Sequence, residues 1–140
     1  MSAENKAIVR HVLDSITQGN VDEAARSIAP DFVWHGPGAE VRGPEGWKQL
    51  VASYLTAFPD LSFTIEDQIA EGDRVATRYT ARGTHQGDLA GVAASGRPVI
   101  VPCQQLDRIV DGKFIESFEL FDQFGMFAAI GTLPALPESV

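Results

Sequence analysis

The sequence predicts an α+β fold, with a mainly antiparallel sheet and helices packed on one face of it. Segments whose apolar residues recur at helical spacing come first, and segments that alternate apolar and polar residues follow. That order is typical of α+β proteins, in which helices and strands are segregated along the chain. A length of 140 residues suits one compact domain. We therefore expect a single domain over residues 1–140.

Three helices are expected in the first half of the chain. Residues 2–18 carry apolar side chains at helical spacing, and Gly19 follows as the usual residue just past a helix C-terminus. Asn20 begins a short second helix that stops before Pro30. The third helix, residues 44–58, has a proline at its first position and a broad apolar stripe. These apolar stripes need a sheet to pack against.

The strands are predicted from alternation and from turn signals. The odd positions of the segment after the third helix are mostly apolar, which predicts a strand with one buried face. An Asp-Gly pair with the composition of a tight hairpin turn separates the last two strands. The expected strands are residues 31–35, 61–69, 74–85, 98–110 and 113–122, with glycine-rich loops at 36–43 and 86–97 and one closing helical turn at 124–130.

Composition excludes several classes of partner. Nineteen acidic against eleven basic residues give a formal net charge of −8, which repels nucleic acids and anionic membrane surfaces. No apolar stretch approaches the roughly 20 residues that span a bilayer, and the N-terminus lacks the pattern of a secretory signal. We therefore expect a cytoplasmic protein without nucleic-acid or membrane partners.

Disulfides and metal sites are not expected either. Cys103 is the only cysteine, so the chain can form neither an internal disulfide nor a thiolate zinc site. Its position in the middle of a strand is typical of an inert buried thiol. The three histidines are scattered, and no pair of them has metal-ligand spacing.

The last strand carries the most informative candidate for acid/base chemistry. Its positions of one parity are Phe114, Glu116, Phe118, Leu120 and Asp122. If this face looks inward, Asp122 is a carboxylate facing a hydrophobic interior, where desolvation disfavours the ionised form and tunes the group for proton transfer. The alternative is that Asp122 caps the turn that follows, and spacing alone favours that role.

Other polar residues have two interpretations each. Asp67 interrupts an apolar strand face and is either a second buried acid or, as we prefer, turned to solvent by a twist or bulge. His35 and His85 end strands, where each could reach a pocket mouth or bond to loop backbone. Arg78 and Arg82 share a strand face and either bind an anionic substrate or form a solvated stripe.

The C-terminal half contains segments that resemble a known family. The segments AFPDLSFTIEDQIAEGDRVATRYTARGTHQG, GRPV and RIVDGKFIESFELFDQFGMFAAIG are similar to the SnoaL-like polyketide cyclases of the nuclear-transport-factor-2-like (ketosteroid-isomerase-like) superfold. The WHGPG segment and the helix at 44–58 agree with that family in order and spacing. The resemblance therefore covers nearly the whole chain.

The resemblance implies a cone-shaped fold, in which a curved, mixed, mainly antiparallel sheet and the three helices enclose an apolar pocket. It implies no cofactor and no metal. Asp122, in FDQFG, takes the position of the family's general acid/base, and His35 and His85 stand where the family often has histidines. The family commonly has EHW before its aspartate, whereas this chain has Ser117 and Phe118, a change that enlarges or depolarises the pocket.

The function expected from the resemblance is a cofactor-independent cyclase or isomerase, of the lyase or isomerase class, that acts on a small hydrophobic carbonyl compound. The reaction would be enolisation followed by aldol-type ring closure, with Asp122, His35 and His85 as catalytic residues. The residues expected to bind the substrate are Trp34, Tyr54, Phe58, Phe63, Arg82, Phe114, Phe118 and Leu120.

Two alternative functions are open at this stage. A hydrolase or dehydratase of the same fold would need a second polar residue to hold water, and Asp67, His35 and Tyr54 are the candidates. A non-catalytic ligand-binding or dimerisation domain would use Asp122 only as a cap.

The predicted strand at 98–110 also bears on assembly. Its apolar residues fall on both sides: Val99, Val101 and Ile109 on one, and Ile100, Leu106 and Val110 on the other. Helices can cover only one of these sides, so we expect a partner subunit on the other, in a homodimer or a tetramer.

Overall fold

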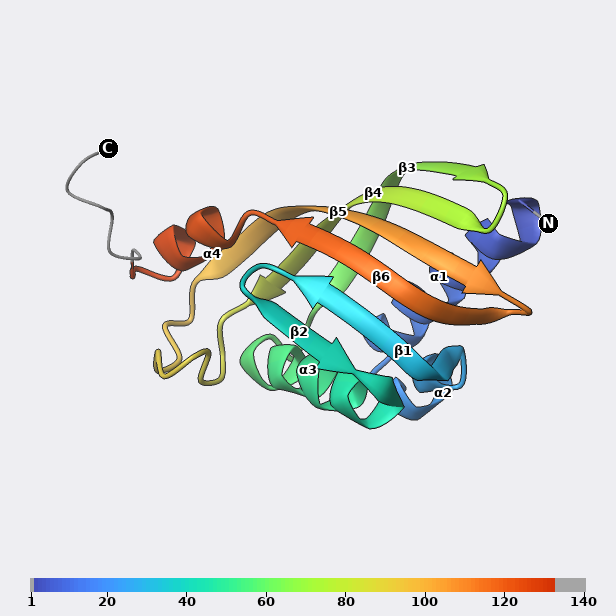
Figure 1. Cartoon of the computed structure of the whole chain (residues 1–140). Helices are drawn as coiled ribbons and strands as arrows, with labels where there is room; N and C mark the ends of the chain where they lie inside the picture. Colours follow the sequence, from blue (N-terminus) through green and yellow to red (C-terminus); the bar gives the residue numbers. More distant parts are fainter. Residues whose placement is uncertain (1, 133–140) are drawn as a thin grey trace, which may run out of the picture.

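The computed structural model describes residues 2–132, which fold into one curved sheet with helices against it (Figure 1). In chain order the elements are α1 (Ser2–Thr17), α2 (Val21–Ala25), β1 (Ile28–Gly36), β2 (Ala39–Arg42), α3 (Gly43–Ala57), β3 (Ser62–Glu71), β4 (Arg74–Thr84), β5 (Pro98–Val110), β6 (Lys113–Phe121) and α4 (Gln123–Ala129). The expected α+β fold is confirmed.

The sheet has the strand order β2-β1-β6-β5-β4-β3. Only β1 and β6 run parallel, and every other neighbouring pair is antiparallel, so the sheet is mixed and mainly antiparallel as expected. Helix α1 packs against β3 and β4, and α3 packs against β1 and β2. Figure 1 shows α4 extending from the end of β6. The two long helices therefore lie at different parts of the same curved sheet.

The glycine-rich segment after β1 is more ordered than the sequence indicates. Residues 36–43 were expected to be a loop, but Ala39–Arg42 forms the short edge strand β2, paired antiparallel with β1. Gly38 has a positive φ of 68°, which permits the tight reversal between the two strands. The strand is mostly exposed, so it lacks the alternation that marks a half-buried strand.

The core lies between the concave side of the sheet and the helices. Helix α1 buries Val12 and Ile16, while α3 buries Trp47. Phe32 in β1 and Phe58, which follows α3 directly, are almost fully buried. The apolar stripes read from the sequence thus face the sheet, as amphipathic helices require.

A bulge in β6 changes which of its side chains face inward. Ile109 pairs with Phe114 and Arg108 with Glu116, so Ile115 is an extra residue that β5 does not match. Phe114 faces the core before the bulge, and Ser117 faces it afterwards. The single inward parity predicted for this strand is therefore wrong beyond Phe114.

A second bulge, in β3, has the effect that the sequence suggested. Ile65 pairs with Tyr79 and Asp67 with Arg78, which leaves Glu66 unmatched. Asp67 is exposed, and its Oδ2 lies 2.7 Å from Nη2 of Arg78. The preferred interpretation of Asp67, a twist or bulge that turns it to solvent, is confirmed.

The outer side of the sheet is unusually apolar. Val99 and Val101 of β5 are buried on the inner side, while Ile100 on the outer side is 66% exposed. The other large apolar residues that are exposed include Ile69, Leu106, Val110, Phe118, Leu120 and Phe124.

Within residues 2–132, no helix is both long and apolar enough to cross a membrane.

Candidate active site

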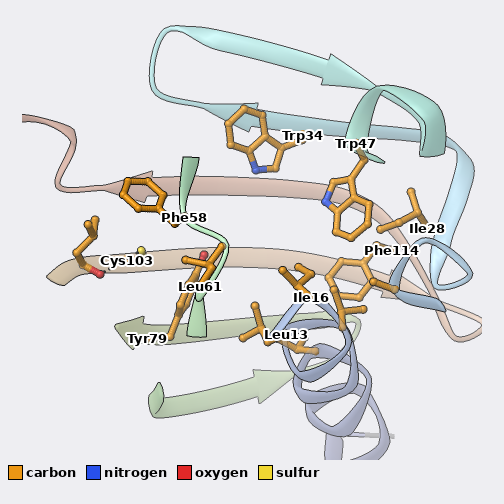
Figure 2. Packing of buried hydrophobic residues seen from close by; sticks show 14 of the residues in the cluster. Leu13, Ile16, Ile28, Trp34, Trp47, Phe58, Leu61, Tyr79, Cys103 and Phe114 are labelled. Atoms are coloured by element: carbon orange, nitrogen blue, oxygen red, sulfur yellow. Dashed lines mark hydrogen bonds between the residues drawn. The ribbon is translucent and has the colours of Figure 1, made fainter. Parts of the chain in front are cut away.

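A cavity lies between the concave side of the sheet and helices α1 and α3. The space within it and at its open mouth is about 970 Å³, and its walls are mostly apolar (Figure 2). Its polar groups come mainly from strands β4, β5 and β6, which contribute Tyr79, Gln105 and Glu119 respectively. A concave apolar site with a few convergent polar groups is the usual form of a small-molecule site.

The cavity brings together most of the residues expected to bind a substrate. Trp34, Tyr54, Phe58, Phe63 and Phe114 all line it. Their contact with a substrate stays a prediction. The remaining three lie elsewhere.

Phe118 and Leu120 are on the outer side of the sheet, 49% and 71% exposed, because the bulge at Ile115 reverses the parity of β6. Arg82 is also exposed, and its Nη1 donates to Oγ1 of Thr64 at 3.1 Å. The sequence-based placement of these three residues in the pocket is therefore wrong.

Glu119 is the carboxylate among the residues that line the cavity. The hydroxyl of Tyr79 donates a hydrogen bond to Glu119 Oε2, and the indole N–H of Trp34 donates to the same carboxyl group. Tyr79 also lies 3.4 Å from Oε1 of Gln105, the residue that pairs with Glu119 across β5 and β6. Three neighbouring strands thus hold one acid in a defined orientation.

The surroundings of Glu119 tune its proton affinity. Burial raises the pKa of the Glu119 carboxyl, and the hydrogen bonds from Tyr79 and Trp34 oppose that rise. Glu119 is half-buried and lines the cavity. A carboxyl group with a raised pKa is suited to accept and return a proton near neutral pH.

Two other ionisable groups near Glu119, Tyr79 and Cys103, stay protonated. Burial, followed by the nearby Glu119 charge, raises the pKa of Tyr79 well above its ordinary value. The same two causes raise the pKa of the Cys103 thiol to about 12. Tyr79 is therefore a hydrogen-bond donor, and Cys103 is the inert buried thiol that its mid-strand position indicated.

A second buried acid lies behind the cavity. Oδ1 of Asp107 accepts hydrogen bonds from Oγ of Ser117 at 2.5 Å and from Nε2 of Gln105 at 2.6 Å. Its Oδ2 has no hydrogen-bond partner in the described part of the chain. Burial raises the pKa of Asp107 to about 7, against the effect of the two hydrogen bonds. Gln105 links this acid to Tyr79 and hence to Glu119.

Asp122 does not face the cavity. It is exposed and is the N-cap residue of α4, where Oδ1 accepts a hydrogen bond from the backbone N–H of Gly125 at 2.8 Å. Strand β6 ends at Phe121, so Asp122 no longer follows the alternation of the strand. The inward orientation predicted for Asp122 is wrong, and the capping role is confirmed.

The two histidines predicted to be catalytic also lie outside the cavity. His35 is on the outer side of the sheet, where its Nε2 lies 2.9 Å from Oε2 of Glu116 and its ring stacks on Phe118 at 4.4 Å. His85 is buried, and its Nδ1 accepts a hydrogen bond from the backbone N–H of Ser95 at 3.1 Å. Bonding to loop backbone, the alternative considered for His85, is confirmed.

Sequence reasoning missed Glu119 because it followed one parity through the whole of β6. One signal could have found the bulge: Phe114 and Ile115 are consecutive large apolar residues, which breaks strict alternation at the start of the strand. Past that break, Ser117, Glu119 and Phe121 share the inner side. In the described residues, no group of three or more His, Cys, Asp or Glu side chains is placed to hold a metal ion.

Comparison with known proteins identifies related sequences. Residues 6–130 match the family model of the SnoaL-like polyketide cyclases. The chain is 30% identical over 137 residues to aklanonic acid methyl ester cyclase DnrD of Streptomyces peucetius, covering 94% of this chain and 93% of that protein. A second aklanonic acid methyl ester cyclase, AcmA of Streptomyces galilaeus, is 29% identical over 134 residues, covering 92% of each chain.

Solved structures agree with the fold. AclR of Streptomyces galilaeus, a proposed hydroxylase, matches with a TM-score of 0.87 at 30% identity, over 99% of this chain and 88% of that one. IdmH of Streptomyces antibioticus, a proposed polyketide cyclase, matches with a TM-score of 0.80 at 30% identity, over 91% of this chain and 99% of that one. The resemblance and the fold expected from the sequence are both confirmed.

Proposed function

Because this chain belongs to the SnoaL-like polyketide cyclase family, we propose that it is a cofactor-independent cyclase in which Glu119, and not Asp122, exchanges protons with the substrate. The observation that carries this proposal is the position of Glu119 in an apolar cavity, with Tyr79 and Trp34 donating to its carboxyl group. The substrate class is a hydrophobic polyketide carbonyl compound, in keeping with the cyclases to which the chain is similar.

The reaction follows from the chemistry of the site. The Glu119 carboxylate removes a proton from the carbon next to a substrate carbonyl, which forms an enolate. The enolate carbon attacks a second carbonyl of the same molecule, forming the ring C–C bond and an alkoxide. Glu119 then returns the proton to the alkoxide oxygen, so the product is an isomer of the substrate and no other reactant is used.

The residues around Glu119 support both proton transfers. Tyr79 keeps its proton, so it can donate a hydrogen bond to the carboxylate or to a developing oxyanion. The apolar walls, which include Leu61 and Phe63, limit the water that would otherwise protonate the enolate. The hydrolase and dehydratase alternatives lose support, because Asp67 and His35, two of the residues considered for holding water, lie outside the cavity.

Glu119→Gln tests the proposal, with Asp122→Asn as its matched control. With aklanonic acid methyl ester as the assay compound, we expect Glu119→Gln to lower kcat by about 10²–10⁴-fold, because the amide cannot carry the proton. Asp122→Asn keeps a good helix cap and should retain wild-type kcat. Equal activity of wild type and Glu119→Gln at equal thermal stability would exclude Glu119 as the acid/base.

The pH profile gives a second readout of the same proposal. Enolisation needs the carboxylate form, so kcat/KM of the wild type should rise with pH through the pKa of Glu119, which burial places above the ordinary glutamate value. Asp122→Asn should show the same rise. A rise at the ordinary glutamate pKa would mean that the reacting group is an exposed acid.

We also propose that the outer side of the sheet joins two copies of the chain in a homodimer. Ile100, Phe118 and Leu120 are 66%, 49% and 71% exposed, which is an apolar surface of the kind that interfaces cover. Sedimentation at micromolar concentration should show a dimer for the wild type and a monomer for Leu120→Glu. A wild-type monomer would exclude the interface.

A further inference from the structure

Asp107 is a buried acid that contacts the cavity wall through two hydrogen bonds. It lies on β5 behind the cavity and is 0% exposed. Its Oδ1 accepts hydrogen bonds from Ser117 and Gln105, and both of those residues line the cavity. Its Oδ2 has no hydrogen-bond partner within residues 2–132. Because an unpaired polar atom in the interior opposes folding, stability does not account for an acid at this position.

The Asp107 carboxyl group decides which way the Gln105 amide faces. A glutamine amide has donors at one end and an acceptor at the other, and the two ends have nearly the same shape. Oδ1 of Asp107 accepts a hydrogen bond from Nε2 of Gln105 at 2.6 Å, so Oε1 of Gln105 faces the other way. There it lies 3.4 Å from the hydroxyl of Tyr79. The opposite orientation of the amide would present a donor to that hydroxyl instead of an acceptor.

The Tyr79 hydroxyl therefore has one proton to donate and two acceptors. It donates to Oε2 of Glu119, while its 3.4 Å distance from Oε1 of Gln105 is long for a hydrogen bond. Burial, followed by the nearby Glu119 charge, raises the pKa of Tyr79 well above its ordinary value, so the hydroxyl keeps its proton. An ionised carboxylate is a stronger acceptor than a neutral carboxyl group. The preferred acceptor of Tyr79 thus depends on whether Glu119 carries a proton.

We propose that Asp107 is a positioning residue, which holds the Gln105 carbonyl where it accepts the Tyr79 hydrogen bond while Glu119 carries the substrate proton. The assignment rests on the proposed function. The hydroxyl points to Glu119 before the proton is taken, turns to Gln105 once Glu119 is protonated, and turns back when the proton is returned. No proton leaves Tyr79 or Asp107 in this cycle. The second acceptor stabilises the protonated form of Glu119, which makes its carboxylate a stronger base.

The titratable groups that interact with Glu119 bear on how the proposal is tested. They are Tyr79 on β4, Cys103 and Asp107 on β5, and Tyr54 on α3. Burial raises the pKa of each, so the two tyrosines and the cysteine stay protonated near neutral pH. Asp107, with a pKa of about 7, changes charge there. One variant must therefore remove the second acceptor and leave Asp107 in place.

Gln105→Met is that variant, because methionine has a similar length and lacks both the carbonyl and the amide donors. With the assay compound, kcat should fall about tenfold, the effect of one hydrogen bond. The rise of kcat/KM with pH should also move to lower pH, because Glu119 loses the acceptor that favours its protonated form. A wild-type kcat with an unshifted pH profile would overturn the assignment.

A double-mutant cycle shows whether Asp107 acts through Gln105. Asp107→Leu keeps the branched shape of aspartate and removes the acceptor, which frees the amide to turn, so kcat should again fall about tenfold. In the Gln105→Met background the same substitution should lower kcat no further, because the amide that Asp107 positions is already absent. Losses that multiply would mean that Asp107 acts by another route. Asp107→Ala, which cannot crowd the site, takes the place of Asp107→Leu in the cycle if the leucine variant does not fold.

Glu119→Gln separates this inference from the proposed catalysis. If Glu119→Gln loses turnover while Gln105→Met keeps the wild-type kcat and pH profile, catalysis by Glu119 stands and the positioning role of Asp107 fails. If Glu119→Gln remains fully active, the proposed function fails. The positioning role is then read without turnover, from an NMR titration of the Glu119 carboxyl with ¹³C-labelled glutamate. The midpoint of that titration should be lower in Gln105→Met than in the wild type, and an equal midpoint would exclude the second acceptor.

Discussion

The two sides of the sheet place acidic side chains in opposite electrostatic surroundings. On the inner side, Glu119 and Asp107 lie among apolar residues, and burial raises the pKa of each carboxyl. On the outer side, Asp67 lies 2.7 Å from Arg78 in an exposed pair, and Glu116 lies 2.9 Å from His35 in a half-buried pair. The side of the sheet on which an acid lies therefore decides its surroundings more than its neighbours along the sequence do.

Glu116 and Glu119 illustrate the point within a single strand. Both belong to β6, yet Glu116 pairs with a histidine on the outer side while Glu119 lines the cavity. Side chains three positions apart on a strand point to opposite sides, and the bulge at Ile115 decides which of them points inward. The chemical role of an acid here is therefore decided by strand register, and three substitutions test that comparison.

The largest expected effect is that of Asp107→Asn on the pH dependence of stability. The pKa of Asp107 is about 7 in the folded state, against 3.8 for an unperturbed aspartate. The folded state therefore binds this proton more tightly than the unfolded state does. The contribution of Asp107 to the free energy of unfolding is fully present below pH 4, and about 4 kcal/mol of it is lost as the pH rises toward 7. Urea denaturation at several pH values should show that loss in the wild type and not in Asp107→Asn.

The matched control for that series is Asp67→Asn, because Asp67 is exposed on the outer side. The difference between its free energy of unfolding and that of the wild type should stay nearly constant from pH 4 to pH 7. A constant difference for Asp107→Asn as well would mean that Asp107 is not a buried, protonatable acid.

An intermediate effect is expected for Asp122→Ala. The substitution removes the side-chain acceptor that caps α4 and should lower the free energy of unfolding by about 1 kcal/mol. Cyclase activity at a temperature well below unfolding should stay unchanged, and Asp122→Asn should restore the stability. A loss of activity without a loss of stability would return Asp122 to the reaction.

The smallest effect is expected for Asp67→Asn itself. The side chains of Asp67 and Arg78 are each more than half exposed, and such exposed ion pairs contribute about 0–1 kcal/mol to the free energy of unfolding. Salt should reduce the effect further, so urea denaturation in low and high salt is the measurement. A loss of several kcal/mol would show that the outer side is as closed as the inner side, for instance by a partner subunit.

Much of this architecture was predictable because it depends on local periodicity. The apolar stripes of α1 and α3 were read correctly, since each follows a regular period over many residues, and the strand expected at 98–110 is β5. The solvent-facing position of Asp67 was also predicted, because a charged residue interrupts an otherwise apolar face there. In contrast, β2 is a short exposed edge strand without a period of its own, and it was missed.

The sequence by itself determined the family and, apart from β2, the order of helices and strands. Only the tertiary structure decided which acid lines the cavity. Asp122 and Glu119 are both plausible from spacing, but pairing with β5 leaves Ile115 unmatched, and that one residue reverses every later side chain of β6. Register depends on the partner strand, which is why the local sequence pointed to the wrong carboxylate.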